Sequence, residues 1–423
     1  MISILSKYII RTNPKIKRGL QLTYKFVFLD EFQDTTGLQY SLVKQCFLNS
    51  NSIMTAVGDN KQRIMVWAGA LKTVFDDYKR EFNADTKKLI MNHRSAPRLV
   101  DLQRKMYASL HEEDSTIRVS DKWKPEDGTI TLFVAKDDEQ EATVLSEHIA
   151  SKIKLGLEPN RICILCKQKP TNYTERIVDE LKKLQIYARV EDDYQNLIKE
   201  PIVEMLISIL RLAIDIKHPH DWEYIAVKTS ELWNVDSYQS DDYLRMQEAL
   251  DTEIQLLGAM MKNVESKKGF QDVLKHALEF WGENRIKANF PVYGQGTYLK
   301  EVLTKFKDYM WNELESTGKD WLLAIENFEG LHSVPIMTIH KSKGLEYDAV
   351  YFVGLEDSAF WSFKNQPEED RCAFFVALSR AKKEIFFTFC QYRYTSRFPK
   401  QKHDDINEFF ELLKIPGMAN IIE

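Results

Sequence analysis

Two carboxylates stand side by side near the start of the sequence, directly after an apolar segment. Residues 26–29 read Phe-Val-Phe-Leu and are followed by Asp30 and Glu31. A strand that ends in Asp-Glu can hold a magnesium ion through the first carboxylate and orient an attacking water through the second. This division of labour is what phosphoryl transfer from a nucleotide requires. The same pair could also merely end a strand and cap the next helix.

Composition places the chain among globular proteins with real cores. Its 423 residues are 44% apolar, which is compatible with about two to four domains. The net charge of -5 argues against a surface coated in phosphate-binding residues, although every charged residue before Asp30 is basic. This basic start could touch nucleic acid or be a solvated arm. Its members are Lys7, Arg11, Lys15, Lys17, Arg18 and Lys25.

Cysteine usage and hydropathy indicate a cytoplasmic protein with no membrane association. Five cysteines do not suggest a disulfide framework, and neither a signal peptide nor an 18-residue apolar run occurs. Cys163 and Cys166 form a Cys-x-x-Cys pair inside an apolar run, with no second pair. A buried strand is favoured there over a zinc or redox site.

Hydrophobic periodicity predicts an α/β fold that is interrupted once. Strands and helices alternate up to about residue 195, the pattern becomes almost entirely helical from 201 to 328, and strands then return. The expected strands are 26–29, 53–57, 88–91, 129–135, 161–167, 335–339, 349–354 and 384–389. The expected helices outside the helical stretch are 37–47, 71–82, 139–154, 173–184 and 370–382.

Five segments carry a family resemblance when they are taken together. In this order and spacing they resemble superfamily 1 DNA helicases of the UvrD, Rep and PcrA type, over nearly the whole chain. The segments are Asp-Glu-Phe-Gln-Asp at 30–34, Val-Gly-Asp-Asn-Lys-Gln-Arg-Ile-Met-Val-Trp-Ala-Gly-Ala at 57–70, Asn-His-Arg-Ser at 92–95, Met-Thr-Ile-His-Lys-Ser-Lys-Gly-Leu-Glu-Tyr at 337–347, and a stretch at 368–381 that contains Phe-Phe-Val-Ala-Leu-Ser-Arg-Ala.

The resemblance implies RecA-like P-loop NTPase lobes, which are parallel sheets flanked by helices. The first lobe is expected to be incomplete and to occupy residues 1–86. The second lobe is expected at 87–195 and 331–423, with an all-helical insertion at 196–330. In the insertion, only length and position match the mobile 2B subdomain of the family.

The resemblance also implies roles at a site for ATP and Mg²⁺. Asp30 matches the Mg²⁺ carboxylate, Glu31 the base that activates water, and Gln62 the glutamine that senses the γ-phosphate and links nucleotide to DNA. Arg94 and Arg380 match two arginines that neutralise charge on the transferred phosphoryl group. Further nucleotide-binding positions are His93, Gly344 and Glu346, and Glu346 matches a carboxylate that takes a ribose hydroxyl.

Two of the residues in these segments could instead have an ordinary structural role. Arg380 is expected on a helix beside Lys382 and Lys383, where a lone arginine is ordinarily a solvated side chain. Asp34 could cap the helix that begins near Gly37 instead of contacting a ligand.

Single-stranded DNA, or a 3′-tailed duplex, is the expected partner. Trp67 matches a base-stacking tryptophan, while Thr338 and His340 stand where family residues meet the sugar-phosphate backbone. Thr338 could equally be structural. The tail interleaves basic and aromatic residues and is as compatible with a rim beside DNA as with surface decoration. These tail residues are Tyr392, Arg393, Tyr394, Arg397 and Phe398.

The chain departs from the family pattern at several positions. Met65 and Ala68 stand where a tyrosine and an arginine are usual, and His93 replaces an adenine-stacking tyrosine. No Gly-x-x-x-x-Gly-Lys-Ser/Thr phosphate loop occurs in the sequence. Without such backbone amides and lysine, affinity for phosphates and transition-state stabilisation should both collapse.

Two functional hypotheses follow. The first is a fragment of an ATP-dependent 3′–5′ DNA helicase or translocase that is missing its phosphate-binding loop. The alternative is a non-hydrolysing DNA-binding or regulatory module, completed by a partner subunit. Such motors serve repair, replication or anti-phage defence complexes, so a protein partner from any of these is compatible with the sequence. Intact catalytic residues favour the first hypothesis.

Overall fold

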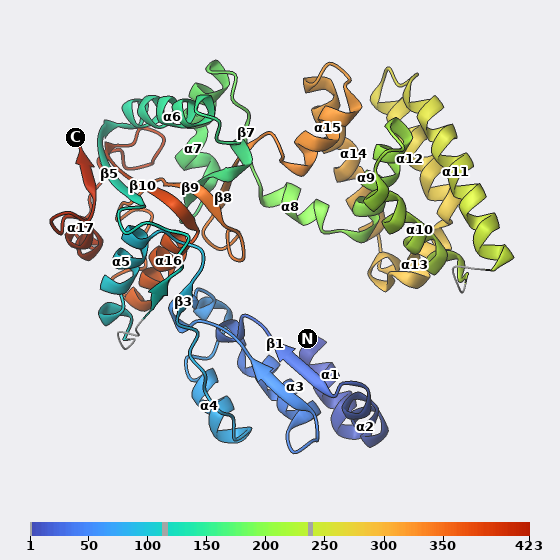
Figure 1. Cartoon of the computed structure of the whole chain (residues 1–423), viewed down its shortest axis with the longest axis horizontal. Helices are drawn as coiled ribbons and strands as arrows, with labels where there is room; N and C mark the ends of the chain where they lie inside the picture. The colour runs from blue at the N-terminus through green and yellow to red at the C-terminus, as the bar shows by residue number, and fades with distance from the viewer. Residues whose placement is uncertain (1, 112–116, 236–239) are drawn as a thin grey trace. The chain divides into compact units, whose positions relative to one another are not determined.

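The computed structural model describes residues 2–111, 117–235 and 240–423. The chain divides into two compact units, which are described separately (Figure 1). Unit 1 consists of Met1–Ile186 and Ile336–Glu423, and unit 2 of Tyr187–Pro335. The expected helical insertion at 196–330 falls within the range of unit 2.

A seven-stranded sheet forms the centre of the α/β part. Its order is β11-β5-β10-β9-β6-β8-β7, and the five pairs from β11–β5 to β6–β8 are parallel. Parallel strands covered on both faces are apolar at every position, and all five residues of β6 are buried. The strands are β5 Thr129–Asp137, β6 Ile162–Cys166, β7 Ala188–Val190, β8 Val334–Thr338, β9 Tyr347–Phe352, β10 Ala381–Tyr392 and β11 Asn420–Ile422.

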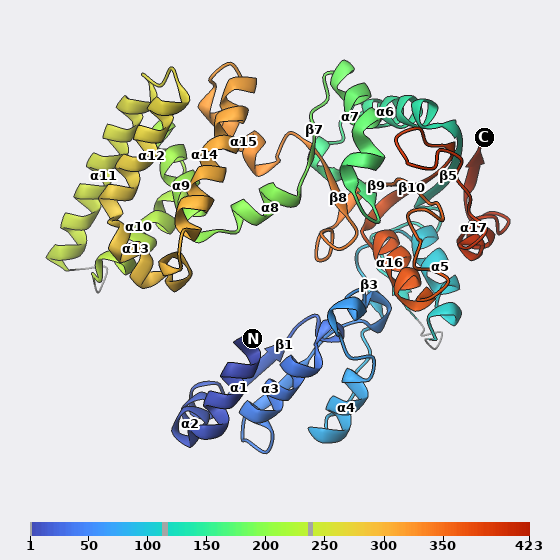
Figure 2. The same ribbon diagram turned by 180° about the vertical axis from the view of Figure 1, so that it is seen from behind.

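Helices cover both faces of this sheet (Figures 1 and 2). Neighbouring residues of β10 point to opposite faces, so Phe387 stacks on Phe374 of α16 while Phe386 lies against His148 of α6. The α/β fold class expected from the sequence is therefore confirmed. The helices are α5 Pro97–Lys105, α6 Asp138–Lys154, α7 Pro170–Lys183, α16 Pro367–Ser379 and α17 Asn407–Leu413, with short 3₁₀ turns η4 Ala108–Leu110 and η5 Pro159–Arg161.

Residues 2–83 of unit 1 form a smaller α/β assembly. Its strands β1 Phe26–Leu29 and β2 Ile53–Ala56 pair in parallel. Phe32 follows β1 and packs edge-on against Tyr40, Phe75 and Tyr78, which fixes the turn after the strand. The other elements are α1 Ile2–Thr12, α2 Pro14–Thr23, η1 Phe32–Asp34, α3 Gly37–Phe47, η2 Asn60–Gln62, η3 Val66–Ala68 and α4 Val74–Glu81.

Several expected elements differ from the structure. The strand expected at 88–91 is the two-residue β3 Met91–Asn92, which pairs only with β4 Arg118–Val119 outside the main sheet. The helix expected at 71–82 begins at Val74, because the backbone amide of Leu71 donates to the Thr35 carbonyl. The strands β4, β7 and β11 and the helices α1, α2, α5 and α17 were not predicted.

The end of α16 is a further correction. The helix stops at Ser379, whereas the sequence predicted that it runs to 382. Arg380 ends it, and the Arg380 carbonyl accepts a hydrogen bond from the amide of Tyr347. Pairing with β9 therefore begins at Ala381, and Lys382 and Lys383 belong to strand β10.

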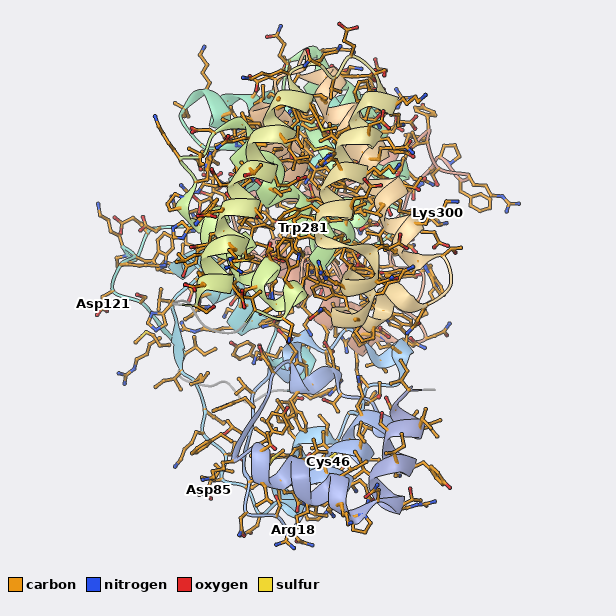
Figure 3. All side chains as sticks on the ribbon, turned by 90° about the vertical axis from the view of Figure 1, so that its right-hand side faces the viewer. Arg18, Cys46, Asp85, Asp121, Trp281 and Lys300 are labelled. Carbon is orange, nitrogen blue, oxygen red and sulfur yellow. The ribbon has the colours of Figure 1, made fainter. Side chains whose placement is uncertain are left out.

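Unit 2 consists mostly of helices, as expected from the sequence. Trp281 (labelled in Figure 3) is fully buried in its core and donates from its indole nitrogen to Thr229 at 3.1 Å. Part of the expected helical stretch, residues 236–239, lies outside the described residues. The helices are α8 Asp192–Ile198, α9 Pro201–Ile214, α10 Pro219–Trp233, α11 Asp241–Met261, α12 Lys267–Trp281, α13 Glu283–Asn289, α14 Tyr298–Ser316 and α15 Trp321–Glu329, with the 3₁₀ turn η6 Pro291–Gly294.

The cysteine interpretation agrees with the structure. Cys163 and Cys166 are completely buried in β6, and all five cysteines are free thiols. Among the described residues, no helix is both long and apolar enough to cross a membrane.

The tail residue Arg393 is not part of a surface rim. It is buried, and its guanidinium binds Glu141 through two hydrogen bonds and Glu356 through three. The two carboxylates are themselves almost inaccessible. Arg393 therefore joins α6 to the loop after β9, while Tyr394 and Phe398 of the same tail are exposed.

Replacing Arg393 with methionine should destabilise the chain by about 3–5 kcal/mol, because two buried carboxylates would lose their counterion. Equilibrium urea unfolding measures this change. Arg397→Met, at an exposed position of the same tail, is the matched control. A loss for Arg393→Met no larger than that of the control would show that the buried pairs do not support the fold.

Candidate functional site

The two carboxylates after β1 lie on a sharply turned backbone. Glu31 has φ 49° and ψ 39°, a left-handed conformation that is uncommon for residues other than glycine. Asp30 Oδ1 accepts a hydrogen bond from the Glu31 amide at 2.8 Å, and Gln33 Nε2 donates to Glu31 Oε2 at 2.6 Å. Both carboxylates are exposed at the end of the strand. Such a turn presents neighbouring side chains in fixed, different directions.

Lys343 is a charged partner of this turn that the sequence analysis did not identify. Its ammonium lies 2.9 Å from Glu31 Oε2 and also pairs with Asp34. Burial raises the pKa of the Asp34 carboxyl, and the Lys343 ammonium opposes that rise. The sequence offered one indication that Lys343 belongs to the site, which is its position within the 337–347 motif.

Asp34 does not cap the next helix. The N-cap of α3 is Thr36, which accepts from the Gln39 amide and forms a capping box with that residue. Asp34 instead faces Lys343, so it belongs to the charged cluster that contains Glu31.

Arg380 and Gln62 are in direct contact. Arg380 Nη2 donates to Gln62 Oε1 at 2.8 Å, and Gln62 Nε2 donates to Asp59 Oδ2 at 3.1 Å. The interpretation of Arg380 as a solvated side chain is wrong, because only 2% of it is exposed. Desolvation, followed by the nearby charge of Arg94, lowers the pKa of Arg380 to about 10. The guanidinium is still a cation at neutral pH.

Further donors of Arg380 bind the loop that follows β8. Nη1 donates to the carbonyl oxygens of Leu345 at 3.1 Å and Ser342 at 3.5 Å. Within this loop, Gly344 has φ 82°, and the Leu345 amide closes a turn onto Ser342. Since φ in this range favours glycine, Gly344 allows the turn that carries the loop carbonyls to Arg380.

Arg94 and Glu346 form a second ion pair of the site. Arg94 Nε donates to Glu346 Oε2 at 2.7 Å, and its Nη1 donates to the Ser379 carbonyl at 3.1 Å. Lys382 binds the other oxygen of Glu346 at 2.7 Å. The hydrogen bond from Lys382, then that from Arg94, lowers the pKa of Glu346. His93 is exposed immediately before Arg94.

Trp67, Thr338 and His340 gather beside the end of β8. The Trp67 side chain is 69% exposed, and its ring lies edge-on to His340 with 6.4 Å between ring centroids. His340 Nε2 lies 3.1 Å from the Ile64 carbonyl, which identifies this nitrogen as the protonated one. Desolvation lowers the pKa of His340, although part of the ring is open to solvent. Thr338 Oγ1 accepts from the Lys341 amide at 3.4 Å.

The structure thus gathers the predicted residues from all five segments. Charged and amide side chains link the 30–34, 59–63, 94, 343–346 and 380 positions through direct contacts. Within the part of the chain that the structure describes, Asp30 forms no hydrogen bond or ion pair with an arginine, and it is joined to the cluster through the Glu31 amide. Among the described residues, no group of three or more His, Cys, Asp or Glu side chains could hold a metal ion.

This arrangement defines a class of protein. A parallel sheet flanked by helices, with polar and charged side chains where strands end, is the architecture of nucleotide-binding α/β proteins. The UvrD-like helicase C-terminal domain matches residues 87–240 and 299–392, more than half of the chain, and the UvrD/REP helicase N-terminal domain matches residues 1–83. The chain belongs to the UvrD-like helicase family.

Curated relatives agree with this assignment. The chain is 25% identical to the ATP-dependent DNA helicase Rep of Buchnera aphidicola subsp. Acyrthosiphon pisum, over 91% of this chain and 66% of Rep. It is 24% identical to DNA helicase II of Haemophilus influenzae (90% and 57%) and 22% identical to the ATP-dependent DNA helicase PcrA of Bacillus subtilis (89% and 56%). The chain thus spans less than two thirds of the length of these relatives.

Arg380→Lys should loosen both segments that the guanidinium joins, since an ammonium group cannot reproduce its planar fork of donors. Hydrogen–deuterium exchange should become faster in peptides that cover residues 59–63 and 342–347. Arg176→Lys, at a half-exposed position on α7, is the matched control. Unchanged exchange in both segments would contradict the linking role of Arg380.

Proposed function

We propose that this chain is part of an ATP-dependent 3′–5′ DNA translocase or helicase that acts on single-stranded DNA. The observation that carries the proposal is the contact between Arg380 and Gln62, around which Glu31, Arg94 and Glu346 gather. The Rep and PcrA relatives are named as ATP-dependent DNA helicases, which supports the same activity.

The proposed roles follow from the chemistry of each side chain. Bound MgATP would supply the phosphoryl group. The exposed carboxylate of Asp30 suits Mg²⁺, because this ion is usually held by only one or two protein carboxylates together with phosphate oxygens. Glu31 would take the proton of the attacking water, and Arg94 and Arg380 would neutralise charge on the phosphoryl oxygens.

Lys343 gives this site a defined resting arrangement. Its ammonium and the Gln33 amide both bind Glu31 Oε2, which orients the carboxylate and leaves Oε1 to accept a proton. Arg94 and Lys382 each bind one oxygen of Glu346, and the remaining lone pairs of that carboxylate could accept a ribose hydroxyl.

We further propose that a phosphate-binding loop comes from residues outside these 423, on the same or another polypeptide. The exposed side chains of the β1–β2 pair support this proposal. Phe26, Phe28 and Ile53 are 62%, 73% and 59% exposed, whereas parallel sheets are ordinarily covered on both faces. A segment that covers this face would lie against β1, the strand that leads to Asp30. The alternative is a non-hydrolysing DNA-binding module that a partner subunit completes, and the same exposed face is compatible with it.

Trp67→Ala should weaken binding of a fluorescent oligo(dT) by about 1–3 kcal/mol, because the variant loses a base-stacking surface. Fluorescence anisotropy titration measures the affinity. Glu31→Gln serves as the comparison, since its side chain lies in the nucleotide cluster and its DNA affinity should match the wild type. Equal affinities of Trp67→Ala and wild type would refute the stacking role, and the absence of any binding by the wild type would refute the proposed function.

A further inference from the structure

A second exposed tryptophan lies outside the five sequence motifs. Trp361 is 69% exposed, the same fraction as Trp67. Only 1% of Ala359 and of Phe360 and 8% of Phe363 are exposed, so the loop after β9 is anchored in the core on both sides of Trp361. Packing in the core explains why the neighbours of Trp361 are apolar, but it does not explain a large apolar side chain at the exposed position 361.

One hydrogen bond orients the indole of Trp361, and the residues around it are hydrogen-bonded in turn. Its Nε1 donates to Gln168 Oε1 at 3.4 Å, and Gln168 Nε2 in turn donates to the Ala359 carbonyl at 3.3 Å. The adjacent Ser362 accepts from Lys167 at 3.2 Å and donates to Asp370 at 3.1 Å. An aromatic ring that is positioned in this way loses little further conformational entropy when a ligand stacks on it.

The two tryptophans lie at one edge of the sheet. Strands β6, β8 and β9 are parallel neighbours, so their carboxyl ends share this edge. Gln168 follows β6, Trp361 lies in the loop after β9, and His340, whose ring lies beside Trp67, follows β8.

The first turn of α16 contacts residues next to both tryptophan rings. The Glu369 carboxyl accepts a hydrogen bond from the Trp67 amide, and the next residue, Asp370, accepts from Ser362 beside Trp361. Lys169, exposed next to Gln168, places a cation at the same edge. An open aromatic face with a nearby cation is the combination that binds single-stranded nucleic acid without sequence preference.

We propose that Trp361 is a second base-stacking residue, which takes a nucleotide base of the same single strand that Trp67 contacts. This inference rests on the proposed function, because it extends the DNA path from Trp67 and His340 along the carboxyl edge of β8, β6 and β9. Gln168 is a positioning residue that orients the indole, and Lys169 faces the backbone phosphates. A single exposed hydrophobic side chain is common on protein surfaces, but Trp361 is also oriented by a hydrogen bond and lies at the same edge of the sheet as a second exposed tryptophan.

The test is a titration of the full 423-residue chain with fluorescein-labelled oligo(dT), followed by anisotropy. Trp361→Ala should weaken binding about 5- to 100-fold, and Trp361→Phe should restore most of the affinity because a phenyl ring still stacks. The dependence of affinity on salt should keep its slope in both variants, since no phosphate contact is removed. Leu155→Ala, an exposed apolar position after α6 at the opposite edge of the sheet, is the matched control.

Intrinsic fluorescence provides a second readout. Stacking on a base quenches indole emission, so the quench produced by oligo(dT) should be smaller in Trp361→Phe than in the wild type. Trp67→Phe, measured in parallel, separates the two tryptophans.

The outcomes distinguish this inference from the proposed function. If Trp67→Ala weakens binding while the affinity of Trp361→Ala and the quench in Trp361→Phe match the wild type, the role of Trp361 is overturned and the proposed function stands. If the wild type does not bind oligo(dT), both are overturned. Weaker binding by Trp361→Ala with recovery in Trp361→Phe supports the inference.

Discussion

A buried guanidinium constrains the centre of unit 1. A charged group removed from water must have its donors satisfied, and Arg380 does this with oxygens from three parts of the chain. Its partners are the Val376 carbonyl within α16, the Leu345 carbonyl after β8, and the Gln62 side chain after β2. The Arg380 carbonyl also receives the Tyr347 amide, where pairing of β9 with β10 begins. The end of α16, the start of β10 and the position of Gln62 therefore depend on one residue, through its backbone carbonyl and its guanidinium.

Residues of the proposed nucleotide site and of the proposed DNA path are close neighbours in sequence. Gln62 and Trp67 are five residues apart, and Thr338 precedes Glu346 by eight. Each short segment thus carries one residue of the proposed nucleotide site and one of the proposed DNA path. Arg380 contacts both segments, so a displacement of Arg380 on nucleotide binding would be transmitted to both, which is a physical route for coupling the proposed hydrolysis to the proposed movement along DNA.

Local patterns in the sequence were sufficient for elements that local rules determine. The bounds of β1 and α3 were predicted without error, since an apolar run and a turn rich in threonine and glycine mark them. The predicted α/β class and the family were confirmed. Long-range contacts decided the features that were missed. From its sequence neighbours Arg393 is expected at the surface, and only its contact with Glu141, which is distant in sequence, explains why it is buried. The end of α16 at Ser379 likewise depends on Tyr347, and the contact of Lys343 with Glu31 joins positions on either side of unit 2 in the sequence.

The most direct test of this account is ATP turnover by the 423-residue chain, measured with and without oligo(dT), with Glu31→Gln as the blank. Because the phosphate-binding loop is proposed to come from residues outside this sequence, we expect that the chain binds oligo(dT) but shows no ATP turnover above the blank. Turnover that rises with DNA and disappears in Glu31→Gln would contradict it, because these residues would then contain a phosphate-binding element of their own.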